Sequence, residues 1–205
     1  MTIKLKGSTD GSVSLQAPAD TSPTGTDKTF TLPTADGTAG QVLSTNGSGA
    51  LSFVNAITEV DQWYLTADLT SDGDLTNLAR NNHEGATKIG TGMSVSSGVF
   101  TFPSTGKWLV IAKAQFLCND ADNVSLQTHV TLDNSSYNTV TYASDANNGT
   151  GARAGGSSSF YFLDVTDTSL VKVKFVGSSI GSGSQISGNT IQVESGFVFI
   201  RLGDT

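Results

Sequence analysis

One short segment of the sequence has the spacing of a hydrolase nucleophile. Gly177-Ser-Ser-Ile-Gly181 matches the pattern Gly-x-Ser-x-Gly, in which Ser179 would be the nucleophile. That chemistry needs a turn from a strand into a helix, and a histidine later in the chain. Here the motif leads into a stretch rich in glycine and serine, and no histidine follows Ser179. We therefore predict a plain loop at this position and a protein that is not an enzyme.

The two histidines and a few loop carboxylates are the remaining groups with metal-binding chemistry. His83 lies among turn residues and His129 on the polar face of an expected strand, and neither forms a ligand cluster with Cys118. We expect both imidazoles to be solvated. Asp72-Gly-Asp74 and Asn119-Asp-Ala-Asp122 place carboxylates in loops, but neither segment has the length of a dedicated calcium loop. We predict ordinary turn acids and no cofactor or metal, with a structural calcium ion as the alternative.

Composition favours a β-rich fold and excludes two classes of partner. Only 14% of residues are charged, and 18 Asp and Glu outweigh 11 Lys and Arg. Without a basic cluster, nucleic acids and anionic membrane surfaces are not expected partners. No segment reaches the ~20 apolar residues that a membrane span needs. Abundant Gly, Ser, Thr, Asn and Asp favour turns over long helices. The single Cys118 can form no internal disulfide, and we predict that it is buried.

Residues 1–55 differ in character from the rest of the chain. They contain three of the four prolines and only two aromatic residues, Phe30 and Phe53, which are too few for a separate core. Apolar residues nevertheless alternate within short strand-like pieces, which predicts a segment that orders against other chains. These pieces are Ser12–Gln16, Thr29–Leu32 and Gln41–Ser44.

From about Asp61 onward, strand-like runs alternate with turn residues at regular spacing, which predicts an antiparallel sandwich. The expected strands are Gln62–Leu69, Val99–Phe102, Lys107–Leu117, Asn123–Leu132, Tyr137–Tyr142, Ser158–Val165, Leu170–Val176 and Ser195–Leu202. Asp74–Asn81 is expected to form one or two helical turns with Asp74 as the N-cap.

Two of the expected strands, Lys107–Leu117 and Ser195–Leu202, are apolar on both faces. A strand of this kind is buried on both faces. In a sandwich one face meets the second sheet, and with no helices available the natural cover for the other face is another subunit. The pattern therefore predicts a homo-oligomer. The residues expected in the core or in subunit contacts are Trp108, Leu109, Ile111, Phe116, Phe160, Phe162, Phe197 and Phe199.

Residues 61–204 resemble the globular heads of complement-type and tumour-necrosis-factor-like proteins. The resemblance lies in Phe102-Pro-Ser-Thr-Gly106 followed by KWLVIAKAQF, then in Asn123–Leu132, in SSFYFLDVTDTSLVKVKF and in the terminal SGFVFIRLGD. It implies an all-β jelly roll that assembles as a compact homotrimer. Some heads of this family bind calcium near the top of the trimer.

The stretches GTGMSVSSGVFTFPSTGKW and GSVSLQAPADTSPTGTDKTFTLPTADGTAGQVLSTNGSGALSF are similar to tail-fibre proteins of marine bacteriophages, where such segments connect heads to the virion. This resemblance implies a trimeric virion protein. Residues 1–55 would be an extended shaft that attaches to another virion protein, and residues 56–205 an antiparallel jelly-roll head.

We predict a tail-fibre or tip protein for host recognition. The loop Asn147–Ser157, which contains Arg153, is expected to face a glycan or protein of the host surface, because recognition tends to lie on loops held by a rigid scaffold. A capsid decoration or head-fibre protein without a receptor role is the alternative.

Overall fold

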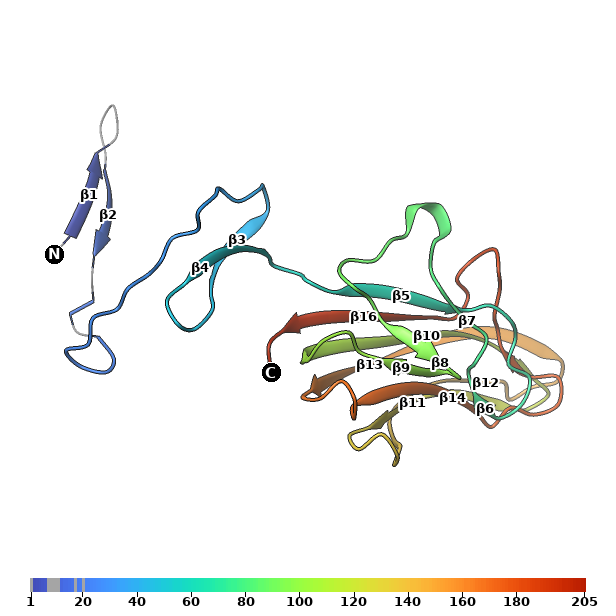
Figure 1. The fold of residues 1–205 in the computed structure, drawn as a ribbon. Helices are drawn as coiled ribbons and strands as arrows, with labels where there is room; N and C mark the ends of the chain where they lie inside the picture. The colour runs from blue at the N-terminus through green and yellow to red at the C-terminus, as the bar shows by residue number, and fades with distance from the viewer. Residues whose placement is uncertain (1, 7–11, 17, 20) are drawn as a thin grey trace. The chain divides into compact units, whose positions relative to one another are not determined.

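The computed structural model describes residues 2–6, 12–16, 18–19 and 21–205, and the chain divides into two compact units, Met1–Ala56 and Ile57–Thr205. Strands dominate both units (Figure 1). The described residues form no α-helix and one turn of 3-10 helix, η1 (His83–Gly85). In this part of the chain no helix is long and apolar enough to cross a membrane.

The N-terminal unit contains two β-hairpins. In the first, β1 (Thr2–Lys6) pairs antiparallel with β2 (Ser12–Gln16). In the second, β3 (Gln41–Thr45) pairs antiparallel with β4 (Leu51–Asn55). The strand expected at Thr29–Leu32 is reduced to one parallel bridge. Gly47 and Gly49, with φ of 82° and 92°, supply the left-handed backbone of the turn between β3 and β4.

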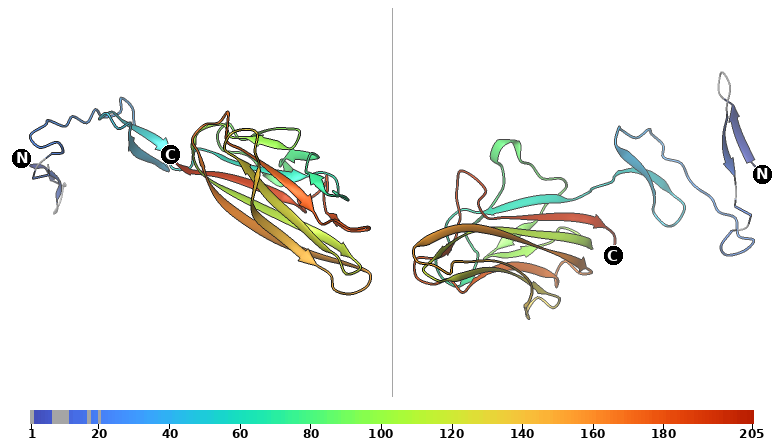
Figure 2. Two further views of the ribbon diagram at one scale, coloured as in Figure 1. Left: turned by 90° about the horizontal axis from the view of Figure 1, so that it is seen from below. Right: turned by 180° about the vertical axis from the view of Figure 1, so that it is seen from behind.

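The head, residues 57–205, is a sandwich of two six-stranded antiparallel sheets (Figure 2). The first sheet has the order β13-β10-β16-β5-β7, with β15 paired to β10. The second has the order β12-β11-β14-β9-β8, with β6 paired to β14. The predicted all-β antiparallel sandwich is confirmed.

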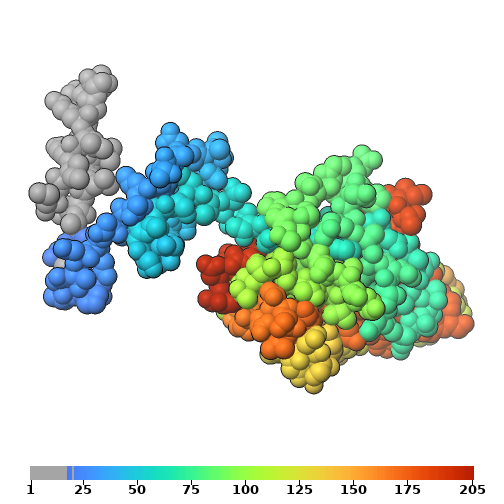
Figure 3. Space-filling view, in the orientation of Figure 1, coloured from blue at the N-terminus to red at the C-terminus, as the bar shows by residue number. Residues whose placement is uncertain are grey.

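The strands of the first sheet are β5 (Val60–Leu65), β7 (Leu78–Arg80), β10 (Gly106–Asn119), β13 (Ala152–Val165), β15 (Gln185–Ile186) and β16 (Gly196–Gly203). Those of the second are β6 (Gly73–Asp74), β8 (Ser94–Ser96), β9 (Val99–Thr101), β11 (Asn123–Thr131), β12 (Asn138–Ala146) and β14 (Lys172–Ser178). The loop between β11 and β12 stands out from the head (yellow in Figure 3).

Aromatic side chains from both sheets fill the space between them. Phe100, on β9, lies within 5.8 Å, between ring centroids, of Trp63, Phe175 and Phe199. Phe175 also stacks on Phe197 at 4.0 Å, with 22° between the ring planes. Edge-to-face and stacked pairs add to the burial of apolar area. The head therefore has one continuous aromatic core, which holds the first sheet against the second.

The predicted helical turns at Asp74–Asn81 are wrong. Asp74 ends strand β6, and its carboxylate forms an ion pair with Lys174 at 2.9 Å. Leu78–Arg80 form β7, which pairs with β5. The helical propensity of this short segment is overridden because pairing with two sheets satisfies its backbone groups and places Arg80 beside a buried carboxylate.

That carboxylate belongs to Asp61, whose side chain is only 2% exposed. It accepts hydrogen bonds from Trp63 Nε1 at 2.8 Å, from Arg80 Nε at 3.0 Å and from the Met93 backbone N–H at 2.8 Å. The Arg80 guanidinium also lies over the Trp63 ring, 4.8 Å from its centroid. Asp61 therefore joins β7 and the loop before β8 to strand β5.

Replacing Asp61 with alanine is expected to lower the free energy of unfolding by about 3 kcal/mol, because three donors lose their acceptor at once. Asp164, which is exposed and paired with Lys107 at the surface, is the matched control. Its replacement by alanine should change stability by no more than about 1 kcal/mol. Urea unfolding of both variants at equal protein concentration measures the difference, and equal losses would show that Asp61 has no special structural role.

Candidate subunit interface

The structure places no catalytic partner beside Ser179. This residue lies in the loop between β14 and β15, with a backbone φ of 61°. In the described part of the chain its hydroxyl is in reach of Ser178 Oγ alone, at 3.5 Å, and the loop leads to strand β15 instead of a helix. The geometry of a nucleophile elbow is not present at this segment.

The prediction that both histidines are solvated is wrong. His83 Nε2 is buried and has no hydrogen-bond partner among the described residues, and its ring centroid lies 4.9 Å from that of Tyr64. His129 is half-buried on β11, with Nε2 2.8 Å from Gln127 Oε1. Burial, and then the positive charge of Lys174, lower the pKa of His129. Cys118 is buried, as predicted, and burial raises the pKa of its thiol.

The loop carboxylates hold neighbouring loops together. Asp122 Oδ2 accepts the Gly181 backbone N–H at 3.0 Å, and a hydrogen bond from Ser184 is the main reason that the pKa of Asp122 is lowered. Asp120 Oδ1 accepts the Gly151 N–H at 2.6 Å, and Asp72 Oδ1 the Ile180 N–H at 2.8 Å. Across the described residues, His, Cys, Asp and Glu form no group of three or more that would hold a metal ion.

These bonds gather three loops at one end of the head into a polar surface, here called the loop tip. It comprises residues 119–122, 147–151 and 179–184. Further bonds join them: the Ala121 N–H donates to Gly149 O at 2.8 Å, and the Asn119 N–H donates to Ser184 Oγ at 2.9 Å. A hollow of about 360 Å³ opens between the first and third of these loops.

Arg153 does not lie in a loop, which corrects the prediction. Strand β13 begins at Ala152, and Arg153 pairs with Cys118 of β10. Its side chain is exposed at the margin of the loop tip and donates from Nη1 to Ala146 O at 2.8 Å. That the three loops of the loop tip lie together was not predicted from the sequence. The one sequence feature that these loops share is their content of polar residues.

The outer face of the first sheet carries apolar residues in rows that cross three strands. On β10, Leu109 lies between Phe162 of β13 and Ile200 of β16. Ile111 lies in the next row along, between Phe160 and Val198. We call Leu109, Ile111, Phe160, Phe162, Val198 and Ile200 the apolar sheet face.

The residues expected in the core or in subunit contacts divide between the two sides of this sheet. Four of them point inward and are at most 1% exposed: Trp108, Phe116, Phe197 and Phe199. The other four belong to the apolar sheet face. Leu109 and Ile111 are half-buried, whereas Phe160 and Phe162 are 65% and 62% exposed. The two exposed rings pack edge to face, 6.1 Å apart.

Charged residues border the apolar rows along the strands. Next to the Leu109 row, Lys107 forms a surface ion pair with Asp164. Beyond the Ile111 row, the exposed Lys113 lies opposite Ser158 and Gly196. A contiguous apolar patch with a polar rim is typical of a protein interface.

The head is similar in fold to solved structures. No protein-family model matches the sequence, and no curated protein is detectably similar to it. Murine APRIL, in a crystal structure at pH 8.5, matches with a TM-score of 0.50 and 9% identity, over 70% of this chain and 98% of that one. Eiger TNF from S. frugiperda matches with a TM-score of 0.50 and 16% identity, over 71% of this chain and 93% of that one. The head has a tumour-necrosis-factor-like jelly-roll fold.

The tumour-necrosis-factor-like fold confirms the architecture implied by the sequence resemblance. At this level of identity the likeness concerns the fold alone. Support for a subunit interface lies in this head's own residues, above all in the apolar sheet face.

Proposed function

We propose that this chain is a non-enzymatic, homotrimeric virion protein, a tail fibre or tip protein that recognises the host. The apolar sheet face is the observation that carries the proposal. Its two exposed phenylalanines would each contribute about 2 kcal/mol on burial. Copies of the same chain are the proposed cover, and the resemblance to tumour-necrosis-factor-like heads favours three of them. A homotrimer leaves the charged rims exposed and covers the apolar rows.

The head has two distinct ends, which supports an outward-facing role for the loop tip. The head begins at Ile57, and Val60 pairs with Ile200 near the C-terminus, at the end of β10 marked by Lys107 and Gly203 (Figures 1 and 2). We call this end the base. Strand β10 runs from it for 14 residues, roughly 43 Å, to Asn119 in the loop tip. The chain therefore enters the head at the end away from the loop tip.

The chemistry of the loop tip suits a hydroxyl-rich ligand such as a host surface glycan. Its hollow is lined by carboxylates, an amide, a hydroxyl and backbone, which accept and donate hydrogen bonds in shallow, solvated sites. The exposed Arg153 adds a donor at the margin. Three weak contacts presented by one trimer would give useful avidity. The residues that line the hollow are Asn119, Asp120, Asp122, Gly181 and Ser182.

Binding of labelled full-length protein to susceptible cells tests the receptor role. We expect the trimer to bind, and Arg153→Glu to weaken binding about tenfold or more, because three tips lose the contact together. Ser179→Ala is the control: Ser179 belongs to the loop tip but does not line its hollow, so this variant should bind like the original chain. Both variants should keep the trimer mass in light scattering.

Immunogold labelling of intact particles tests the location. Gold at the tail tip supports the fibre proposal. Gold on the capsid, together with a trimer that binds no susceptible cell, would replace it with the decoration role. A protein absent from purified particles would overturn both.

A further inference from the structure

Residues 29–55 of the N-terminal unit have a defined backbone structure but no core. Thr31 bridges to the β3–β4 hairpin: its N–H donates to Gly49 O at 2.9 Å, and the Leu51 N–H donates to Thr31 O at 2.9 Å. Asn46 Oδ1 closes the turn by accepting the Ser48 N–H at 2.9 Å. Yet no residue among 18–19 and 21–56 is buried. We call residues 29–55 the β3–β4 module.

The β3–β4 module exposes large apolar side chains on both faces. Leu43 lies opposite Phe53 on one face, and Val42 lies opposite Val54 on the other. Five residues remain substantially exposed: Phe30 at 64%, Leu32 at 70%, Val42 at 46%, Leu43 at 52% and Phe53 at 39%. Scattered surface apolar residues are ordinary, but this density in so small a unit marks an interaction surface.

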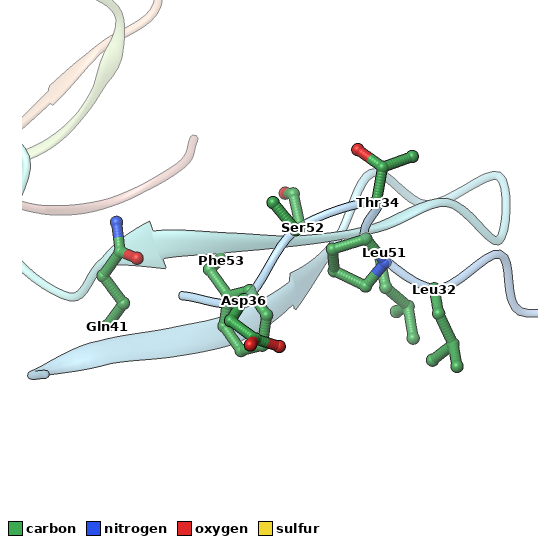
Figure 4. A pocket seen from close by; sticks show the side chains of 9 residues that line it. Leu32, Thr34, Asp36, Gln41, Leu51, Ser52 and Phe53 are labelled. Atoms are coloured by element: carbon green, nitrogen blue, oxygen red, sulfur yellow. The ribbon is translucent and has the colours of Figure 1, made fainter. Parts of the chain in front are cut away.

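One side of the module is hollowed into a groove of about 440 Å³ (Figure 4). Leu32, Leu51 and Phe53 point to the same side of the hairpin. The loop at Gly37 covers the Phe53 ring only in part, and a Cβ added at Gly37 would lie 2.6 Å from Phe53 Cγ. The groove is therefore open, and its apolar side chains lie among the polar residues Thr34, Asp36, Gln41 and Ser52.

The number of charged residues in the β3–β4 module indicates which kind of partner it can bind. Asp36 is the only charged residue between positions 29 and 56. A single carboxylate in the lining of the groove gives the surface little electrostatic complement to an acidic or basic partner, whereas its exposed apolar side chains can pack against those of an identical copy. In the part of the chain that the structure describes, β3 pairs with β4 alone, which leaves its outer edge available for backbone pairing.

We propose that the β3–β4 modules of three chains pack together into a stalk, in which Leu32, Leu43 and Phe53 bury against their equivalents in the other two copies. This inference rests on the proposed trimer of the head. In that trimer, the modules are joined to three associated heads through a short connection beginning at Ala56. Such tethering gives effective concentrations on the order of millimolar, at which weak apolar contacts associate.

Cysteine cross-linking in the full-length protein tests the stalk. Leu43→Cys and, independently, Leu32→Cys are treated with a short bis-maleimide, and Ser48→Cys in the exposed turn is the matched control. The native Cys118 is buried, so the unsubstituted chain gives the background rate. Equally fast cross-linking of Leu43→Cys and Leu32→Cys, at least about tenfold above Ser48→Cys, is expected from their higher effective concentration.

The mass of each variant separates the two proposals. A trimer whose Leu43→Cys and Leu32→Cys forms react no faster than Ser48→Cys would overturn the stalk and leave the proposed function standing. In that case the groove would have another occupant, such as a different virion protein. A mass of one chain for the unsubstituted protein would overturn the trimer and the stalk together.

Discussion

Replacing Phe160 with glutamate is expected to convert the proposed trimer into folded monomers. The Phe160 side chain is 65% exposed in the single chain, so the head itself tolerates the change. In the proposed trimer the same position is covered by a neighbouring copy. Each interface would then bury an unpaired carboxylate, at a cost of several kcal/mol per subunit. Light scattering should give the mass of one chain at micromolar concentration, with an unchanged far-ultraviolet circular dichroism spectrum.

The control for this experiment is Tyr142→Glu. Tyr142 is an aromatic residue of nearly equal exposure, 62%, on strand β12 of the second sheet. It lies outside the apolar sheet face, so its glutamate variant should remain trimeric. A trimeric Phe160→Glu protein would show that the apolar sheet face is not the subunit interface, and dissociation of both variants would point to a general effect of charge.

Replacing Phe100 with alanine is expected to cost about 4 kcal/mol of unfolding free energy, the usual range for deleting a buried aromatic ring. Phe100 is fully buried, and its ring contacts aromatic side chains of β5, β14 and β16. The cavity would open between the two sheets, where both lose contacts. Denaturant unfolding at fixed protein concentration measures the loss.

The comparison variant is Tyr142→Ala, which removes an exposed ring and should cost no more than about 1 kcal/mol. A loss below about 2 kcal/mol for Phe100→Ala would mean that the core collapses into the cavity and that the sheets are less rigidly packed than the structure indicates.

The long strands could be predicted from the sequence because their information is local. Strand β11 alternates apolar and polar residues with a period of two, β10 and β16 contain continuous apolar runs, and all three are bounded by turn residues. The short strand β7 has no such signal, since three residues show no periodicity. Its strand state depends on pairing with β5 and on the bond from Arg80 to Asp61, a partner 19 residues away. Local helical propensity therefore gave the wrong answer there.

The apolar sheet face was accessible to sequence reasoning because β10 and β16 are apolar on both sides. The position of Arg153 was not. The composition of residues 147–157 is typical of a loop, yet β13 occupies residues 152–157 of this segment because β10 supplies a partner for each residue of the strand, from Gly106 to Asn119. Gly155 fits this arrangement because a Cβ there would collide with the Asp145 carboxylate. Such a requirement comes from the neighbouring strand and leaves no pattern in the segment itself.

The first and the last strand residues of the head both lie near its base, so the head could be exchanged for another as a unit. Thr58 and Glu59 contact Arg201, which lies in the last strand, β16. A junction in the chain before Ile57 and a junction after β16 would therefore lie at the same end of the sandwich. Recombination at these two points would replace one head by another without rebuilding the segment that precedes it. A reporter domain fused after Thr205 would likewise be attached at the base and leave the loop tip uncovered.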